Sequence, residues 1–333
     1  MSQLPVPYPL RLQPFFQDYL WGGRKLQTVL HKPLPADGVW AESWEIVDHP
    51  QHVSIVTNGA FAGESLRHIA HHHRAWLYGH TPALDSLPLL LKYLDCQQVL
   101  SVQVHPNDHY AQKMPTPDLG KTEAWYIISA EPNAVLYAGL KSGVTREQLQ
   151  DAIDNGGVES CLHVLRPQAG DCVFIPAGTV HALGAGLLVA EIQQASNTTF
   201  RLFDWNRLSA TGQPRELHVQ QALEVIDFAS GPRQLQTPQP TDQAGRERLV
   251  RCDKFILDRL ENPPGNQPSL NIGGDHGFHL LTMPRGSGKL QWSSKHSEEL
   301  QLQAGESLLI PAAMPPLTLT LNDDAVLLDM FVR

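Results

Sequence analysis

Two short segments of the sequence carry side chains that could bind a metal ion together. In Ser101-Val-Gln-Val-His-Pro106, Gln103 and His105 are two positions apart. Because side chains of a strand alternate between its two faces, this spacing puts both on one face, where they can converge on one ion. In Gly120-Lys-Thr-Glu-Ala-Trp125, Glu123 opens the next predicted strand and could reach the same point.

A third segment adds a second histidine between turn residues. Gly170 makes the turn into a predicted strand, and Pro176 and Gly178 make the turn out of it. His181 then begins the following strand, and we expect its ring to point inward. Of the three segments, this one has the most specific spacing.

Together the three segments offer two imidazoles, one carboxylate and one amide oxygen. That set of donors suits a borderline divalent cation such as zinc, with an open position for water or substrate. Each residue alone is more often a satisfied core histidine or a surface carboxylate, but their joint occurrence beside glycine and proline turns favours a metal site. We predict one zinc ion per chain, held by Gln103, His105, Glu123 and His181.

Most of the chain must be β-structure to position these residues. Short apolar runs rich in β-formers alternate with Gly, Pro, Asn and Asp turns. The clearest runs are 87–104, 124–129, 134–138, 172–175 and 187–193. This pattern predicts a mainly β fold of the β-sandwich or jelly-roll type.

Helices interrupt the β-pattern at about 64–80, 145–153 and 216–228. The second of these opens with Thr145-Arg-Glu-Gln148, the spacing of a capping box. We expect all three to pack beside the β-core.

The sequence predicts two domains, at 1–232 and 245–333. A polar stretch rich in Pro and Gln, at about 229–241, separates them. Gln168–Ala177 (QAGDCVFIPA) recurs as Gln303–Ala312 (QAGESLLIPA), which indicates a duplicated fold. At the same offset His181 falls opposite Pro316, so the second copy lacks this metal ligand and is expected to be structural.

Composition limits the classes of partner. The net charge of −9 comes without any block of Lys or Arg, which argues against nucleic acid or an anionic membrane surface as the main partner. No apolar run approaches the length that spans a bilayer, and four cysteines without a CxxC pair signal no disulfide framework. We expect a cytoplasmic protein, a monomer or homodimer, acting on a small molecule.

Several motifs resemble those of one family. The pattern Gly-x5-Pro-x-Gly-x2-His at 170–181 resembles the second signature of the cupin superfamily. The segments at 101–106, 120–127 and 175–182 resemble the type I phosphomannose isomerases, as do 191–205 and Tyr19-Leu-Trp-Gly-Gly23. These blocks lie in order from about residue 19 to 207, and the β-rich tail fits the short bacterial form.

The resemblance implies a fold and an activity. The fold is a cupin jelly-roll β-sandwich with helical insertions, followed by a second, smaller, degenerate cupin-like β domain without metal ligands. The activity is an aldose–ketose isomerisation that interconverts mannose 6-phosphate and fructose 6-phosphate through a cis-enediol or enediolate at zinc. Two departures stand out: Gln103-x-His105 replaces the usual cupin His-x-His, and Ala185 stands where many cupins have Asn.

The resemblance also implies roles for single residues. It makes Gln103, His105, Glu123 and His181 the zinc ligands. It puts Arg201 at the substrate, Ser101 and Lys121 near the phosphate or the sugar hydroxyls, and Glu191 on the wall of the same cavity. Trp21, beside Gly22 and Gly23, could belong to a loop over the sugar.

An isomerase of this kind needs a base that can cycle a proton and an electrophile near O1 and O2. Glu191 and Lys121 are the candidates for the base, with a metal-bound water third. We favour Glu191, because a partly desolvated carboxylate can have its pKa raised toward neutrality. Arg201 could stabilise the oxyanion or bind phosphate, and Lys121 could anchor phosphate or act as an acid.

Three other functions fit the same ligands, and one of them is an isomerase that acts on free mannose or another sugar phosphate. Two histidines and a carboxylate in a cupin could hold iron(II) for a dioxygenase, although the phosphate-suited Lys121 and Arg201 count against it. A sugar-binding cupin without catalytic activity is the third alternative. The complete ligand set of the first copy argues against that.

Overall fold

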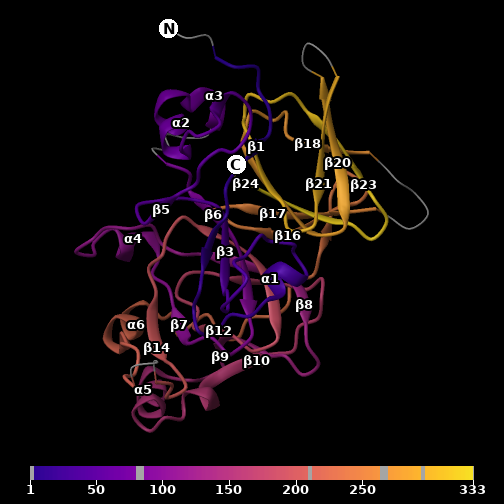
Figure 1. Cartoon of the computed structure of the whole chain (residues 1–333). Helices are drawn as coiled ribbons and strands as arrows, with labels where there is room; N and C mark the ends of the chain where they lie inside the picture. Colours follow the sequence, from indigo (N-terminus) through magenta and orange to yellow (C-terminus); the bar gives the residue numbers. More distant parts are fainter. Residues whose placement is uncertain (1–3, 80–85, 209–211, 263–268, 294–296, 333) are drawn as a thin grey trace. The chain divides into compact units, whose positions relative to one another are not determined.

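The computed structural model describes residues 4–79, 86–208, 212–262, 269–293 and 297–332 (Figure 1). Strands dominate it, so the expected mainly β class is confirmed. The chain packs into two compact units. We call residues 18–23 and 94–236 the central unit, and the residues up to 17, 24–93 and from 237 onward the terminal unit. The sequence-based limits of 1–232 and 245–333 divide the chain differently and stay a prediction.

Antiparallel strands build the central unit. One sheet has the order β10 (Leu162–Leu165), β9 (Leu136–Leu140), β12 (His181–Leu183), β7 (Val102–Val104) and β14 (Phe200–Phe203). A second set of strands pairs in the order β11 (Cys172–Ile175), β8 (Glu123–Ala130) and β13 (Leu187–Gln194). Both sets contribute the strand ends from which the candidate site is built.

Helices cover one face of the five-stranded sheet. They are α4 (Asp108–Ala111), α5 (Arg146–Asp154), α6 (Val219–Val225) and the 3₁₀ helix η2 (Val158–Cys161). Val102 and Val104 of β7 join Leu149 of α5 and Leu223 of α6 in one apolar cluster. Gln103, between the two valines, must therefore face the other side of the sheet, because strand side chains alternate. Figure 1 shows α5 and α6 beside β7 and β14.

The predicted capping box is present at the start of α5. The Thr145 hydroxyl accepts a hydrogen bond from the Gln148 amide, and the Gln148 side chain accepts one from the Thr145 amide. The helix expected at 216–228 is shorter, since Ile226 already has an extended backbone after α6.

The terminal unit is also mainly β. Its larger sheet has the order β1 (Leu10–Arg11), β22 (Ser307–Ile310), β19 (His279–Arg285), β24 (Val326–Phe331), β17 (Ile256–Glu261), β16 (Arg246–Arg251) and β15 (Gln239–Pro240). A four-stranded sheet follows the order β18 (Leu270–Ile272), β23 (Leu317–Leu321), β20 (Ser287–Ser293) and β21 (Ser297–Gln303). Apolar residues of both sheets form one core, as in a sandwich.

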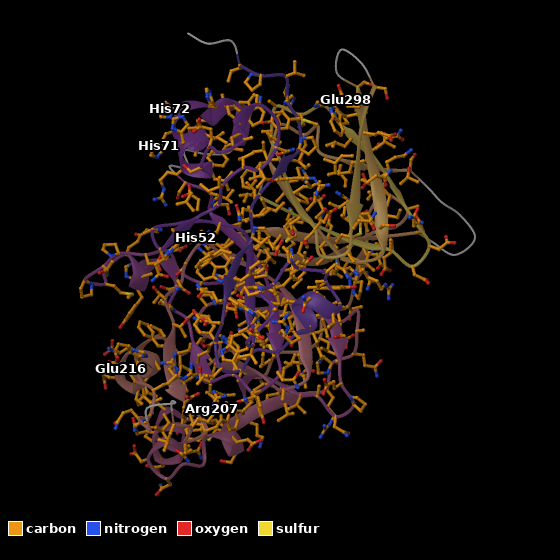
Figure 2. All side chains as sticks on the ribbon, in the orientation of Figure 1. His52, His71, His72, Arg207, Glu216 and Glu298 are labelled. Carbon is orange, nitrogen blue, oxygen red and sulfur yellow. The ribbon has the colours of Figure 1, made fainter. Side chains whose placement is uncertain are left out.

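The N-terminal part of the terminal unit adds short elements. These are β2 (Phe15–Gln17), α1 (Lys25–Thr28), β3 (Glu42–Ile46), β4 (Asp48–His49), β5 (His52–Val53), η1 (Gly59–Phe61), α2 (Leu66–His72), α3 (Arg74–Tyr78) and β6 (Leu89–Cys96), of which the last three residues belong to the central unit. The span expected as a helix at 64–80 holds two helices, because the backbone leaves helical geometry at His73, and residue 80 lies outside the described residues. His71 and His72 project from the surface of α2 (Figure 2).

The same pattern of strand pairing occurs within each of the two units. In the central unit Glu123 pairs with Ile175 on one side and Gln193 on the other. In the terminal unit His279 pairs with Ile310 and with Phe331 in the same way. The sequence repeat aligns Ile175 with Ile310. The expected degenerate second copy is thus present in strand register, with His279 at the position equivalent to Glu123.

The same register makes a second pair of positions equivalent. Trp125 lies two residues after Glu123 and pairs with Glu191. Leu281 lies two residues after His279 and pairs with Asp329.

No helix among the described residues is long and apolar enough to cross a membrane.

Candidate active site

Three of the predicted metal ligands meet in the interior of the central unit. His105 follows β7, Glu123 begins β8 and His181 begins β12. One potential ligand atom from each lies within 4.8 Å of the others, and all three side chains are buried. The strands that carry them come from three separate segments of the sequence.

Backbone carbonyls orient both imidazole rings. Nδ1 of His105 lies 2.9 Å from the Thr198 carbonyl oxygen, and Nδ1 of His181 lies 2.8 Å from that of Thr179. A carbonyl only accepts, so each Nδ1 must carry the proton and donate. In the neutral ring, Nε2 then keeps its lone pair, which is the arrangement found for metal-binding histidines.

His181 is held in its neutral form. Burial foremost, together with the Lys121 ammonium, lowers the pKa of His181 to about 4, against the opposing effects of the Thr179 hydrogen bond and of Glu191. Because only neutral imidazole binds a metal, this ring needs no deprotonation near pH 7. Its Nε2 lies 3.3 Å from Oε1 of Glu123.

Gln103 is the fourth predicted ligand, and it lies beside His181. The two residues pair across β7 and β12, and Nε2 of Gln103 is 3.3 Å from Nε2 of His181.

The turn before His181 depends on Gly178, which has φ +85° and donates its N–H to the His105 carbonyl at 2.9 Å. A Cβ there would also come within 3.0 Å of the Val225 carbonyl oxygen.

Lys121 and Glu191 lie next to the three-residue cluster. Lys121 Nζ is 2.6 Å from Glu123 Oε2, 3.0 Å from His105 Nε2 and 3.7 Å from Glu191 Oε1. Trp125 Nε1 donates to Glu191 Oε2 at 3.0 Å. Both predicted candidates for the base are therefore buried at the same centre.

Arg201 lies on β14, in register with Gln103. Its Nη1 donates to the Glu216 carbonyl at 2.8 Å, and its Nε has no hydrogen-bond partner among the described residues. Burial lowers the pKa of Arg201, and the neighbouring cations Arg215 and Arg207 add to this effect. Ser101 is buried two residues before Gln103.

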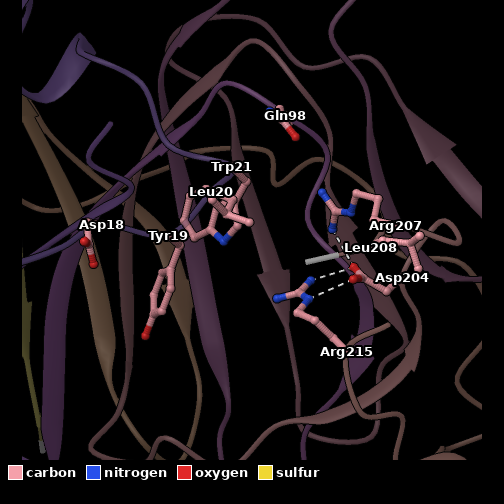
Figure 3. Close-up of a pocket in the computed structure, with 9 residues that line it drawn as sticks. All are labelled: Asp18, Tyr19, Leu20, Trp21, Gln98, Asp204, Arg207, Leu208 and Arg215. Carbon is pink, nitrogen blue, oxygen red and sulfur yellow. Dashed lines mark hydrogen bonds and ion pairs between the residues drawn. The ribbon is translucent and has the colours of Figure 1, made fainter. Parts of the chain in front are cut away.

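Trp21 also belongs to the central unit. It lines a pocket of about 610 Å³ together with Asp204, Arg207 and Arg215, which the sequence did not single out (Figure 3). Asp204 is the second-last residue of the segment 191–205, and Arg207 lies two residues beyond its end. The resemblance of this segment to the family could therefore have pointed to both residues. Arg215 has no comparable motif around it.

Known proteins resemble this chain over most of its length. A family model described as phosphomannose isomerase type I, catalytic domain, matches residues 10–131. Mannose-6-phosphate isomerase ManA of Bacillus subtilis is 40% identical over 283 residues, which cover 85% of this chain and 87% of the relative. Mannose-6-phosphate isomerase of Streptococcus mutans is 38% identical over 305 residues, covering 91% and 92%.

Solved structures agree with these sequence matches. The mannose 6-phosphate isomerase of Bacillus subtilis superimposes with a TM-score of 0.87 at 30% identity, over 97% of this chain and 99% of that one. A variant of phosphomannose isomerase from Salmonella typhimurium shares the fold, with a TM-score of 0.76 at 17% identity over 97% and 99%. The extent and identity of these matches show that the chain belongs to the type I mannose-6-phosphate isomerase family.

Proposed function

We propose that the chain interconverts mannose 6-phosphate and fructose 6-phosphate through a cis-enediol or enediolate intermediate at a zinc site. The observation that supports this most is the buried cluster of His105, Glu123 and His181, with Lys121 and Glu191 beside it, in a chain of the isomerase family.

The side chains present fit a zinc ion. Nε2 of His105 lies 3.6 Å and Nε2 of His181 lies 3.3 Å from the carboxylate of Glu123, and His181 stays neutral near pH 7. The carboxylate of Glu123 and the amide oxygen of Gln103 would complete four protein ligands. When bound, zinc polarises the sugar oxygens or holds a water molecule without one-electron chemistry.

Glu191 is our proposed base. It would remove the proton from C2 of the aldose and return it to C1 of the enediol or enediolate. The proton of the C2 hydroxyl would pass to O1, so that C2 becomes the ketone and C1 a primary alcohol. The hydrogen bond from Trp125 holds one carboxylate oxygen, so the other can face the reacting carbons. Lys121 remains the alternative base; as an ammonium ion, it could instead donate a hydrogen bond to the enediolate oxygen.

Arg201, Ser101, Lys121 and Trp21 are our proposed substrate contacts. The Nε of Arg201 is buried without a partner among the described residues, so a substrate oxygen could satisfy it. The Ser101 hydroxyl, one residue before β7 and two before Gln103, suits a sugar hydroxyl. Trp21 offers an apolar ring for the sugar face.

A coupled assay tests this function. Purified protein should convert mannose 6-phosphate to fructose 6-phosphate, lose activity after chelation and regain it with zinc. Glu123→Gln should lose both bound metal and activity, while Glu147→Gln, at an exposed position of α5, should keep both. Absence of turnover in folded, zinc-loaded protein would reject the isomerase and leave the iron-dependent dioxygenase or a sugar-binding protein.

We also propose that this enzyme acts in the cytoplasm as a monomer or homodimer, on a small phosphorylated sugar. Sedimentation equilibrium of the zinc-loaded protein measures the oligomeric state directly. A larger assembly would contradict this proposal without affecting the proposed activity.

A further inference from the structure

The pocket of the central unit that contains Trp21 also contains two arginines. Its described lining residues are Asp18, Tyr19, Leu20, Trp21, Gln98, Asp204, Arg207, Leu208 and Arg215 (Figure 3). Its volume of about 610 Å³ is within the range of pockets that bind small molecules. The side chains thus combine an apolar wall with a few charged groups.

Asp204 holds both arginines in fixed positions. Arg215 donates to its carboxylate through Nε at 2.7 Å and Nη2 at 2.5 Å, and Arg207 donates through Nη2 at 2.5 Å. Burial raises the pKa of Asp204, but the hydrogen bonds from Arg215 and Arg207 outweigh this and lower it. The three charges sum to +1, which leaves an excess cation.

The backbone directly after Asp204 has an unusual conformation. Trp205 and Asn206 have φ +56° and +55°, a left-handed geometry that is rare for a tryptophan. Two side-chain hydrogen bonds hold this turn against the segment before β7. Trp205 Nε1 donates to the Leu100 carbonyl at 2.7 Å, and Arg207 Nη1 donates to the Val99 carbonyl at 2.6 Å. Such strain is typical of functional sites.

One nitrogen of Arg215 is left for a ligand. Its Nε and Nη2 bind Asp204, while Nη1 has no partner among the described residues. In Figure 3 this third nitrogen turns away from Asp204, toward the side on which Trp21 lies. Asp18, the other acidic residue of the lining, lies apart from both arginines, beyond Tyr19.

This pocket connects with the candidate active site through one strand. Arg201 of β14 pairs with Gln103, and Asp204 follows three residues later, at most about 10 Å along the chain. The arginines also influence Arg201 electrostatically. A sugar phosphate must be bound at both its reacting carbons and its distant phosphate, which demands two separated sites.

We propose that Arg215, held in place with Arg207 by Asp204, binds the phosphate group of the substrate. This inference rests on the proposed isomerase function, since it assigns the phosphate end of the same substrate. Arginine is suited to the role because its planar fork binds phosphate oxygens with directed hydrogen bonds. Asp204 would act as a positioning residue.

Steady-state kinetics and direct binding test the proposal together. Arg215→Gln should raise KM for mannose 6-phosphate at least about tenfold and leave kcat within about threefold, as expected for lost substrate binding. Arg215→Lys, which keeps the charge without the fork, should fall between. Arg166→Gln, which removes an exposed arginine elsewhere in the central unit, should match the wild type.

Calorimetry of the metal-free full chain with inorganic phosphate separates this inference from the isomerase itself. The wild type should bind phosphate and Arg215→Gln should bind it at least about tenfold more weakly. Equal phosphate affinity, or an unchanged KM in a folded Arg215→Gln or Arg215→Lys variant, would overturn the inference while the isomerase stands. A wild type that binds phosphate through Arg215 without turning over the sugar would instead reject the proposed reaction alone.

Discussion

His279 of the terminal unit should make the protein less stable at alkaline pH. The ring is buried between Asp329, at 2.7 Å from Nδ1, and Asp275, at 3.2 Å from Nε2. Burial by itself lowers the pKa of His279, but the two carboxylates, Asp329 foremost, raise it to about 9. Arg246 also contacts Asp329, so the histidine belongs to a network of buried charges.

The size of the effect follows from the shift. An imidazole has an ordinary pKa of 6.5 in the unfolded chain, and the folded value of about 9 lies roughly 2.5 units higher. A raised folded pKa contributes its full stability below pH 6.5 and loses it as the pH rises through 9. At 1.36 kcal/mol per unit, His279 should contribute about 3 kcal/mol at pH 6 and almost none at pH 10.

Urea unfolding at several pH values, in the presence of chelator, measures this contribution. Between pH 6 and 10 the free energy of unfolding should fall by about 3 kcal/mol more in the wild type than in His279→Gln. His71→Gln, which changes an exposed histidine of α2, should behave like the wild type. If wild type and His279→Gln lost stability in parallel across this range, the assigned protonated His279 would be wrong.

Two further predictions concern the central unit. Glu191→Gln should lower kcat by a factor of about 10² to 10⁴ with metal content unchanged, because the amide can still accept the Trp125 hydrogen bond but cannot move a proton. Steady-state kinetics and metal analysis check this, and a kcat above a tenth of the wild-type value would exclude Glu191 as the base. Thr145→Ala should lower the free energy of unfolding by about 1 kcal/mol through loss of the cap on α5, without affecting kcat. Thr145→Ser should keep most of the stability that Thr145→Ala loses, and an equal loss in both variants would show that the hydroxyl is not responsible.

Local patterns predicted much of the site. Alternation predicted that Gln103 and His105 share one face, and the structure has Gln103 in β7 with His105 directly after this strand. Turn residues predicted a strand that begins at His181, and β12 begins there. The capping box of α5 depends only on residues three positions apart, and it was equally readable. These features share a short range in sequence.

Features that depend on distant backbone had no such signal. Any residue can supply a carbonyl, so nothing in the sequence indicated that Thr198 and Thr179 orient the two imidazoles. The ion cluster of Arg215 with Asp204 joins residues eleven positions apart across a loop, outside any regular period. Likewise, the packing of residues 24–93 with the C-terminal segment rests on long-range contacts. The metal and the base stay predictions.

The repeated strand register separates what a fold supplies from what its side chains do. Glu123 and His279 occupy corresponding positions in strand pairing. Glu123 belongs to a cluster suited to a metal, whereas His279 joins a buried ion network. The two sites are therefore natural controls for each other, because the strand pairing at these positions corresponds and the side chains differ. Substitutions at His279 should alter stability and leave catalysis intact, whereas the reverse is expected at Glu191.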